Sequence, residues 1–203
     1  MSVSYDAITT THIENLDLDT PCFDSVVFEL FGHHEDTPEY RQLLGEIRVK
    51  AIKSSDAINF SRALLDEFLE FDGSNVVNIC EAANFDSLLD SGADIVIIQT
   101  LVVDPGLRRL GVGSKLLNHA IDFFRKRMKA PYIAISAAPI DDSKQNTFPA
   151  QFASFDTKLL EEDDPRFNAL SKGNEAFLLA QRFKNVSDNV FERSVEQGKN
   201  HDG

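Results

Sequence analysis

The stretch LVVDPGLRRLGVGSKLL, residues 101–117, decides how this chain folds. Residues 93–103 are almost continuously apolar and rich in Ile and Val, which predicts a strand buried on both faces. Asp104, Pro105 and Gly106 end that strand, because proline cannot donate to a ladder and glycine suits a turn. A helical period then begins, with one apolar face made by Val112, Leu116, Leu117, Ala120, Ile121, Phe124 and Met128. The stretch therefore predicts a strand, a turn, a loop and a helix.

The loop between this strand and helix has the composition of an anion site. Gly111 and Gly113 lack a Cβ atom, so a ligand can approach the backbone there. The first amides of a helix have no partner within the helix and carry partial positive charge, which favours a phosphate. Arg108 and Arg109 add formal positive charge beside these amides. The spacing matches neither a Walker loop nor a dinucleotide fingerprint, since Leu116 stands where the third glycine of that fingerprint belongs.

The remaining pattern, Arg-x-x-Gly-x-Gly after an apolar strand that ends in Val-x-Pro, resembles the GNAT superfamily of acyl-CoA-dependent N-acetyltransferases. The resemblance implies acetyl-CoA as cosubstrate, with no metal. It implies that the backbone of Leu101, Val102 and Val103 binds the acetyl carbonyl and pantetheine, and that Asn174 faces the cofactor arm. It also implies that the pyrophosphate of coenzyme A is held by the amides of Arg108, Arg109, Leu110, Gly111, Val112, Gly113 and Ser114.

The rest of the chain predicts further strands and helices around this unit. Strands are expected at 23–31, 45–52 and 131–138, with the first two forming an antiparallel pair and the third parallel to the central strand. Helices are expected at 56–71 and 75–83, a short turn at 85–89, a helix at 174–183, and a closing hairpin from 183–186 and 190–193. Residues 1–22 fit either a frayed arm or a first strand.

The fold class expected from these elements and from the resemblance is α/β (α+β). Its sheet is mixed and mostly antiparallel, with a central splayed parallel strand pair flanked by helices. We expect a single domain over residues 1–203, with a helical insert at about 55–92, a long loop at about 139–173 and a disordered tail at about 198–203. A homodimer is expected by analogy and because twofold dimers are the commonest oligomers.

Composition narrows the classes of partner. The formal net charge of -13 argues against nucleic acid and favours an amine substrate, either a small molecule or a protein lysine or N-terminus, although solubility alone also explains such a charge. Only Cys22 and Cys80 occur, which indicates a reducing cytoplasm. Neither a secretory signal nor a membrane-spanning apolar run is present in the sequence. His33 and His34 sit among acidic residues without a second ligand group, which favours a solvated loop over a metal site.

The catalytic groups are less well indicated than the cofactor site. Most members of the resembled family use direct attack of an amine on the thioester, which needs a neutral amine, and often a tyrosine on the C-terminal helix. Here that helix has Phe177-Leu178-Leu179, and Gln99-Thr100 occupies the strand position where an acid often lies. Glu46 or a water is therefore the candidate base, and Tyr132 or Ser136 the candidate proton donor.

Three functions stay open from the sequence. The first is transfer of an acetyl or other short acyl group from acyl-CoA to a primary amine. The second is a catalytically weak, acyl-CoA-binding module that regulates or binds a protein, as the missing tyrosine and acid allow. The third is an acidic interaction protein that binds no nucleotide. The acceptor itself is not encoded in the fold.

Overall fold

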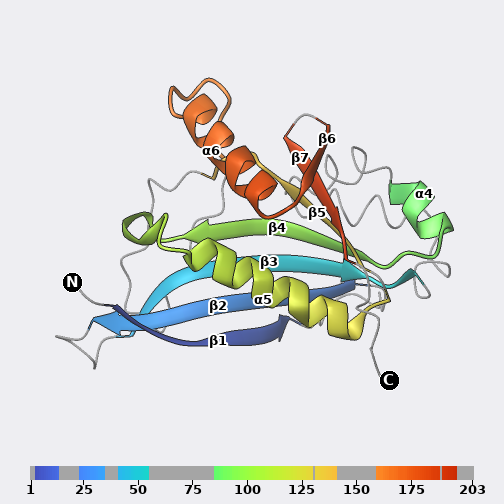
Figure 1. Cartoon of the computed structure of the whole chain (residues 1–203), viewed down its shortest axis with the longest axis horizontal. Helices are drawn as coiled ribbons and strands as arrows, with labels where there is room; N and C mark the ends of the chain where they lie inside the picture. Colours follow the sequence, from blue (N-terminus) through green and yellow to red (C-terminus); the bar gives the residue numbers. More distant parts are fainter. Residues whose placement is uncertain are drawn as a thin grey trace.

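The computed structural model describes residues 3–13, 23–34, 41–54, 85–129, 131–140, 159–187 and 189–195. One seven-stranded sheet runs in the order β1-β2-β3-β4-β5-β7-β6 (Figure 1). The strands are β1 (Val3–Ile13), β2 (Phe23–His34), β3 (Gln42–Ile52), β4 (Ile95–Val103), β5 (Tyr132–Ser136), β6 (Lys184–Ser187) and β7 (Val190–Ser194). The helices of the described residues are α4 (Phe85–Asp90), the one-turn 3-10 helix η1 (Pro105–Leu107), α5 (Val112–Arg127) and α6 (Phe167–Ala180).

The sheet is antiparallel at every described pairing except one. β4 and β5 are parallel, because the chain crosses from one to the other through α5. This confirms the predicted fold class, including the antiparallel pair of β2 and β3, the parallel crossover and the closing hairpin of β6 and β7.

Helix α5 covers one face of the sheet. Side chains alternate across a strand, so Val26, Phe28 and Leu30 of β2 point toward the helix. Phe28 meets the rings of Phe123 and Phe124 edge to face, with centroids 5.2 and 6.1 Å away. The predicted apolar face of α5 is buried from Val112 to Phe124 and continues to Met128. This layer forms the main core.

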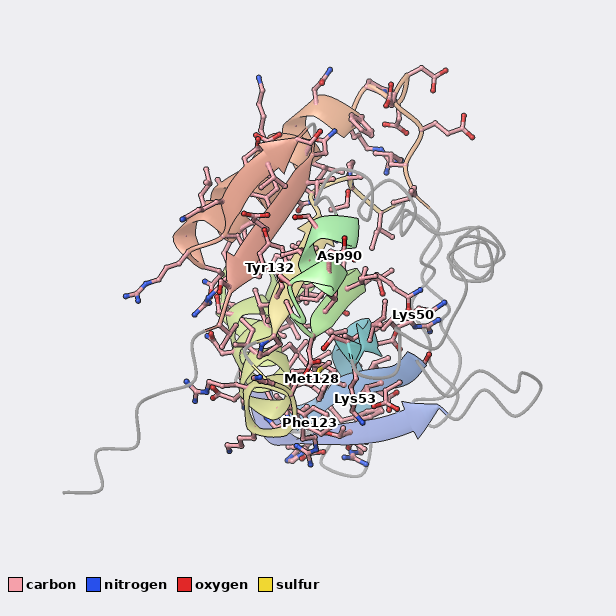
Figure 2. All side chains as sticks on the ribbon, turned by 90° about the vertical axis from the view of Figure 1, so that its right-hand side faces the viewer. Lys50, Lys53, Asp90, Phe123, Met128 and Tyr132 are labelled. Carbon is pink, nitrogen blue, oxygen red and sulfur yellow. The ribbon has the colours of Figure 1, made fainter. Side chains whose placement is uncertain are left out.

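The other face of β3 carries Glu46, Arg48 and Lys50, which alternate with the core residues Ile47 and Val49. Figure 2 looks along the sheet from the end at which β3 stops and β5 begins, and shows Lys50 on the side away from α5. Glu46 and Arg48 therefore share that side.

Residues 3–13 form strand β1, one of the two alternatives left open, since pairing with β2 satisfies their backbone despite their polar side chains. Three boundaries differ from those expected. Strand β2 continues to His34, so the histidines expected in a solvated loop belong to a strand. The turn expected at 85–89 is helix α4. The last helix begins at Phe167 instead of Asn174, so the irregular stretch expected over 139–173 ends sooner. The helices expected at 56–71 and 75–83, most of the loop from 141 to 158 and the tail at 198–203 lie outside the described residues.

None of the described helices has the length and apolar character that crossing a bilayer requires.

Candidate functional site

Strands β4 and β5 separate halfway along β4. They pair from Ile95↔Tyr132 to Ile98↔Ile135, after which β5 ends at Ser136 and β4 continues to Val103. Figure 1 shows β5 turning away from β4 toward α6. From Thr100 to Val103, β4 therefore pairs with β3 on one side and has no described strand on the other, and we call this second side the free edge of β4. Such an edge presents backbone groups that an extended ligand can bind.

A β-bulge at Gln99 marks the point where the strands separate. Val49 pairs with Ile98 and Arg48 pairs with Thr100, so Gln99 is the extra residue. A bulge reverses the side-chain alternation beyond it. Leu101 and Val103 consequently pack toward the α5 layer, whereas Thr100 and Val102 face the opposite side. The bulge thus sets which residues surround the free edge of β4.

The turn after β4 is fixed by Asp104. Its backbone N–H donates to the Leu44 carbonyl over 3.0 Å, and its Oδ1 accepts from the Gly106 N–H over 2.8 Å. Gln42 Nε2 donates to the other carboxylate oxygen over 3.3 Å. These bonds hold η1 at the end of the strand and so determine where the loop before α5 starts.

The loop before α5 places positively charged side chains and helix amides at the same end of the sheet. Arg109 and Gly111 have left-handed backbone, with φ of 67° and 84°. Gly111 is the N-cap of α5 and provides no side-chain cap, so the first-turn amides keep their partial positive charge. Arg108 and Arg109 are exposed beside them. The arrangement fits a pyrophosphate.

Helix α6 packs against this first turn of α5. Gln181 Nε2 lies 3.1 Å from Ser114 Oγ, and a Cβ atom built on Gly113 lies 3.5 Å from Val103 Cγ2 and 3.6 Å from Phe177 Cζ. Asn174 Nδ2 donates to the Ala137 carbonyl over 3.0 Å, which ties α6 to the chain just after β5. The free edge of β4, the start of α5 and the inner side of α6 are therefore neighbours.

The three catalytic candidates do not lie together. Glu46 pairs with Val102 across β3 and β4, is 3% exposed, and accepts from Arg48 Nε over 2.6 Å. Ser136 lies where β5 ends, and its Oγ accepts from the Ala138 N–H over 3.1 Å. Tyr132 pairs with Ile95 at the opposite, closed end of the strand pair. Figure 2 shows Tyr132 at that end, with Met128 and Lys53.

Two polar residues on the face of the sheet away from α5 were not among the candidates from the sequence. Glu29 lies directly across from Glu46, and its pKa is raised by burial and by the Glu46 charge, against the opposing effect of Arg48 and Arg41. Thr100 pairs with Arg48, and its buried hydroxyl has no hydrogen-bond partner among the described residues. Alternation with Phe28 puts Glu29 on the outer face of the sheet, but its pairing with Glu46 depends on the register of the two strands.

Comparison with known proteins gives a family match. The model of the acetyltransferase (GNAT) family matches residues 33–147, more than half of the chain. The sequence matches no curated protein.

Solved structures with similar folds share little sequence with this chain. A mutant of KacT, in which phenylalanine replaces a tyrosine, is 11% identical, with a TM-score of 0.40 over 84% of this chain and 71% of that one. Arabidopsis thaliana NAA60 in complex with acetyl-CoA is 13% identical, with a TM-score of 0.37 over 83% and 76%. A mutant of the AtaT toxin, bound to the C-terminus of the antitoxin AtaR, is 14% identical, with a TM-score of 0.40 over 93% and 94%.

Proposed function

This chain belongs to the acetyltransferase (GNAT) family, and we propose that it transfers an acetyl or other short acyl group from acyl-CoA to a primary amine. The observation that carries the proposal is the proximity of two binding features. The free edge of β4 and the uncapped start of α5 lie at the same end of the sheet. A ligand with an extended arm and a pyrophosphate, such as acetyl-CoA, needs both.

Each part of the site then has a task. The amides from Arg108 to Ser114 bind the pyrophosphate, with the two exposed arginines adding charge. The backbone from Leu101 to Val103 hydrogen-bonds the pantetheine arm and the acyl carbonyl as an added strand would. Asn174 holds α6 against the end of β5 through its hydrogen bond to the Ala137 carbonyl, and so stabilises the side of the site opposite β4.

The reaction is a direct acyl transfer. The neutral amine nitrogen attacks the thioester carbon, the C–S bond breaks, and the coenzyme A thiolate takes up a proton while the new amide nitrogen loses one. Polarisation of the carbonyl by a backbone N–H of β4 would stabilise the oxyanion. Glu46 is the nearest candidate base, since it is one strand from Val102. Ser136 is a candidate proton donor at the end of β5.

Helix α6 favours a second function, a catalytically weak acyl-CoA-binding module. The helix presents Phe177 beside Gly113 and has no tyrosine, so it offers no phenol to protonate the leaving thiolate. A thiol is a moderate leaving group, with a pKa of about 8.5 in the cysteine side chain, so the missing phenol slows transfer without preventing it. Activity therefore decides between the two functions.

The first experiment is a calorimetric titration with acetyl-CoA and CoA. We expect micromolar binding by the wild type. Replacing both Arg108 and Arg109 by Gln should weaken it about tenfold or more, which corresponds to about 1.4 kcal/mol. The control replaces Arg125 and Lys126 by Gln, which removes the same charge from the far, exposed end of α5.

Equal weakening in both double variants would reject the site, and absence of wild-type binding would reject the function. Release of thiol from acetyl-CoA in the presence of a panel of primary amines then separates the enzyme from the binding module. A cytoplasmic location, a homodimer and the absence of nucleic-acid binding stay predictions from the sequence.

A further inference from the structure

Two carboxylates face each other beside the free edge of β4. In the sheet register Glu29 of β2 pairs with Glu46 of β3, and Glu46 pairs with Val102 of β4. All three lie on the face away from α5, where Figure 2 shows Lys50, which shares their alternation. Neighbouring strands are about 4.8 Å apart, so Glu46 lies one strand and Glu29 two strands from β4.

The charges around this pair do not balance. Arg48 binds Glu46 at 2.6 Å, and Arg41 is the other cation that acts on Glu29, although it is already bound to Asp6 at 2.7 Å. Within the part of the chain that the structure describes, three carboxylates therefore lie near two guanidinium groups.

Among the described residues, the cations near this pair number one fewer than the carboxylates. The Nδ1 atom of His33 lies 3.9 Å from Oδ1 of Asp6, so this ring neighbours Asp6 and not the two glutamates. Lys50, the next cation on this face of β3, is four residues from Glu46, about 13 Å along the strand. Like charges placed directly opposite each other destabilise a sheet, so the pairing of Glu29 with Glu46 costs stability.

An independent observation at the same place indicates a polar ligand. The Thr100 hydroxyl oxygen exposes less than 1 Å² and has no partner among the described residues. Thr100 pairs with Arg48 and belongs to β4 just after the bulge, so its side chain lies on the face that holds both glutamates. Buried hydroxyl groups are normally hydrogen-bonded, and an amine nitrogen can supply the missing bond.

We propose that Glu29, Glu46 and Thr100 form the acceptor subsite, and that it selects an aliphatic amine carrying a second positive charge. This inference rests on the proposed acyl transfer. The reacting nitrogen lies by Thr100 and Glu46, next to the free edge of β4. The second ammonium group lies one strand further out, against Glu29. Glu29 is thus a positioning residue, which supplies the charge that distinguishes a diamine from a monoamine.

The test compares 1,4-diaminobutane with 1-aminobutane as acceptors, by thiol release from acetyl-CoA. We expect the wild type to prefer the diamine about tenfold or more in kcat/KM. Glu29→Gln should remove that preference by raising KM for the diamine, with kcat and the monoamine KM changed less than about twofold. Asp122→Asn is the control, because it removes one exposed carboxylate from α5, on the opposite face of the sheet.

A second readout needs no turnover. We expect 1,4-diaminobutane, titrated into the CoA-saturated protein, to bind the wild type and Asp122→Asn about equally, and Glu29→Gln about tenfold more weakly. Absence of diamine binding, an unchanged preference in Glu29→Gln, or an equal loss in Asp122→Asn would overturn the subsite. Acetyl-CoA is also titrated into the wild type and every variant. Absence of acetyl-CoA binding by the wild type would refute the proposed acyl transfer, whereas the diamine results test only the acceptor subsite.

Discussion

Replacing Gly45 by Ala should disturb the packing of β3 against β4 and α5 and so lower the stability of the fold. A Cβ atom built on Gly45 lies 2.7 Å from Leu116 Cδ1 and 3.0 Å from the Val102 carbonyl oxygen. Carbon atoms in good contact are about 3.5–4.0 Å apart, so Leu116 would have to retreat by about 1 Å. Leu116 is fully buried, and the Val102 carbonyl belongs to the backbone of the strand that carries the site.

The expected loss follows from overpacking, which costs about 1–3 kcal/mol in a dense core. We therefore expect the free energy of unfolding to fall by about 2 kcal/mol. For a chain of this length that lowers Tm by about 4–8 °C. Urea unfolding followed by circular dichroism should show a lower midpoint with an unchanged m-value.

Gly113→Ala is the matched control. Its Cβ atom would lie 3.5 Å or more from its neighbours, which is ordinary contact, and within a helix Ala is favoured over Gly by up to about 1 kcal/mol. We expect this variant to unfold at the same or a higher urea concentration. A Gly45→Ala variant within about 0.5 kcal/mol of the wild type would refute the reasoning.

A double-mutant cycle identifies the clash. Leu116→Ala alone should cost about 2–5 kcal/mol because it empties a buried site. In the Gly45→Ala, Leu116→Ala double variant the new methyl group occupies space that Cδ1 has left. The double variant should therefore lose about 1 kcal/mol less than the sum of the single losses. Strict additivity would show that the two groups do not collide.

Three further predictions concern other parts of the molecule. Arg182→Gly should raise stability by about 1 kcal/mol in thermal melts, because Arg182 has a left-handed φ of 66° two residues beyond the end of α6. The backbone N–H groups of Arg182 and Phe183 donate to the Leu179 and Leu178 carbonyls, which hold this conformation. Glu29→Gln should match the wild type below about pH 4 and exceed its stability near neutral pH. The raised folded pKa of Glu29 stabilises only while the carboxyl keeps its proton, so that contribution is lost as pH rises through the folded value, and a pH-independent difference would contradict this. Asp94→Ala should cost about 2–4 kcal/mol in urea unfolding, since its carboxylate accepts from the backbone N–H groups of Ser54 and Lys129 at 3.0 and 2.7 Å, and a loss below about 1 kcal/mol would show that water replaces both bonds.

The sequence determined the elements whose signals are local. The apolar run that ends at Val103 predicted β4, and the helical period from Val112 predicted α5, since both patterns reflect burial of neighbouring residues. The glycines and arginines of the loop between them indicated the family, which the family match confirms. The positive φ of Gly111 is a second reason for a glycine there, besides the access that a missing Cβ atom gives to a ligand.

Tertiary structure decided whatever depends on partners distant in sequence. β1 has polar, exposed Thr9 and Thr11, so only its pairing with β2 makes it a strand. Helix α6 likewise continues through Gly173, a poor helix former, so local propensity does not predict its start at Phe167. The bulge at Gln99 and the approach of Glu29 to Glu46 follow from register, which a one-residue slip would reverse. The loop that identifies the family could therefore be recognised from the sequence, because its residues are consecutive. The side chains proposed to select the acceptor are brought together only by the pairing of three strands.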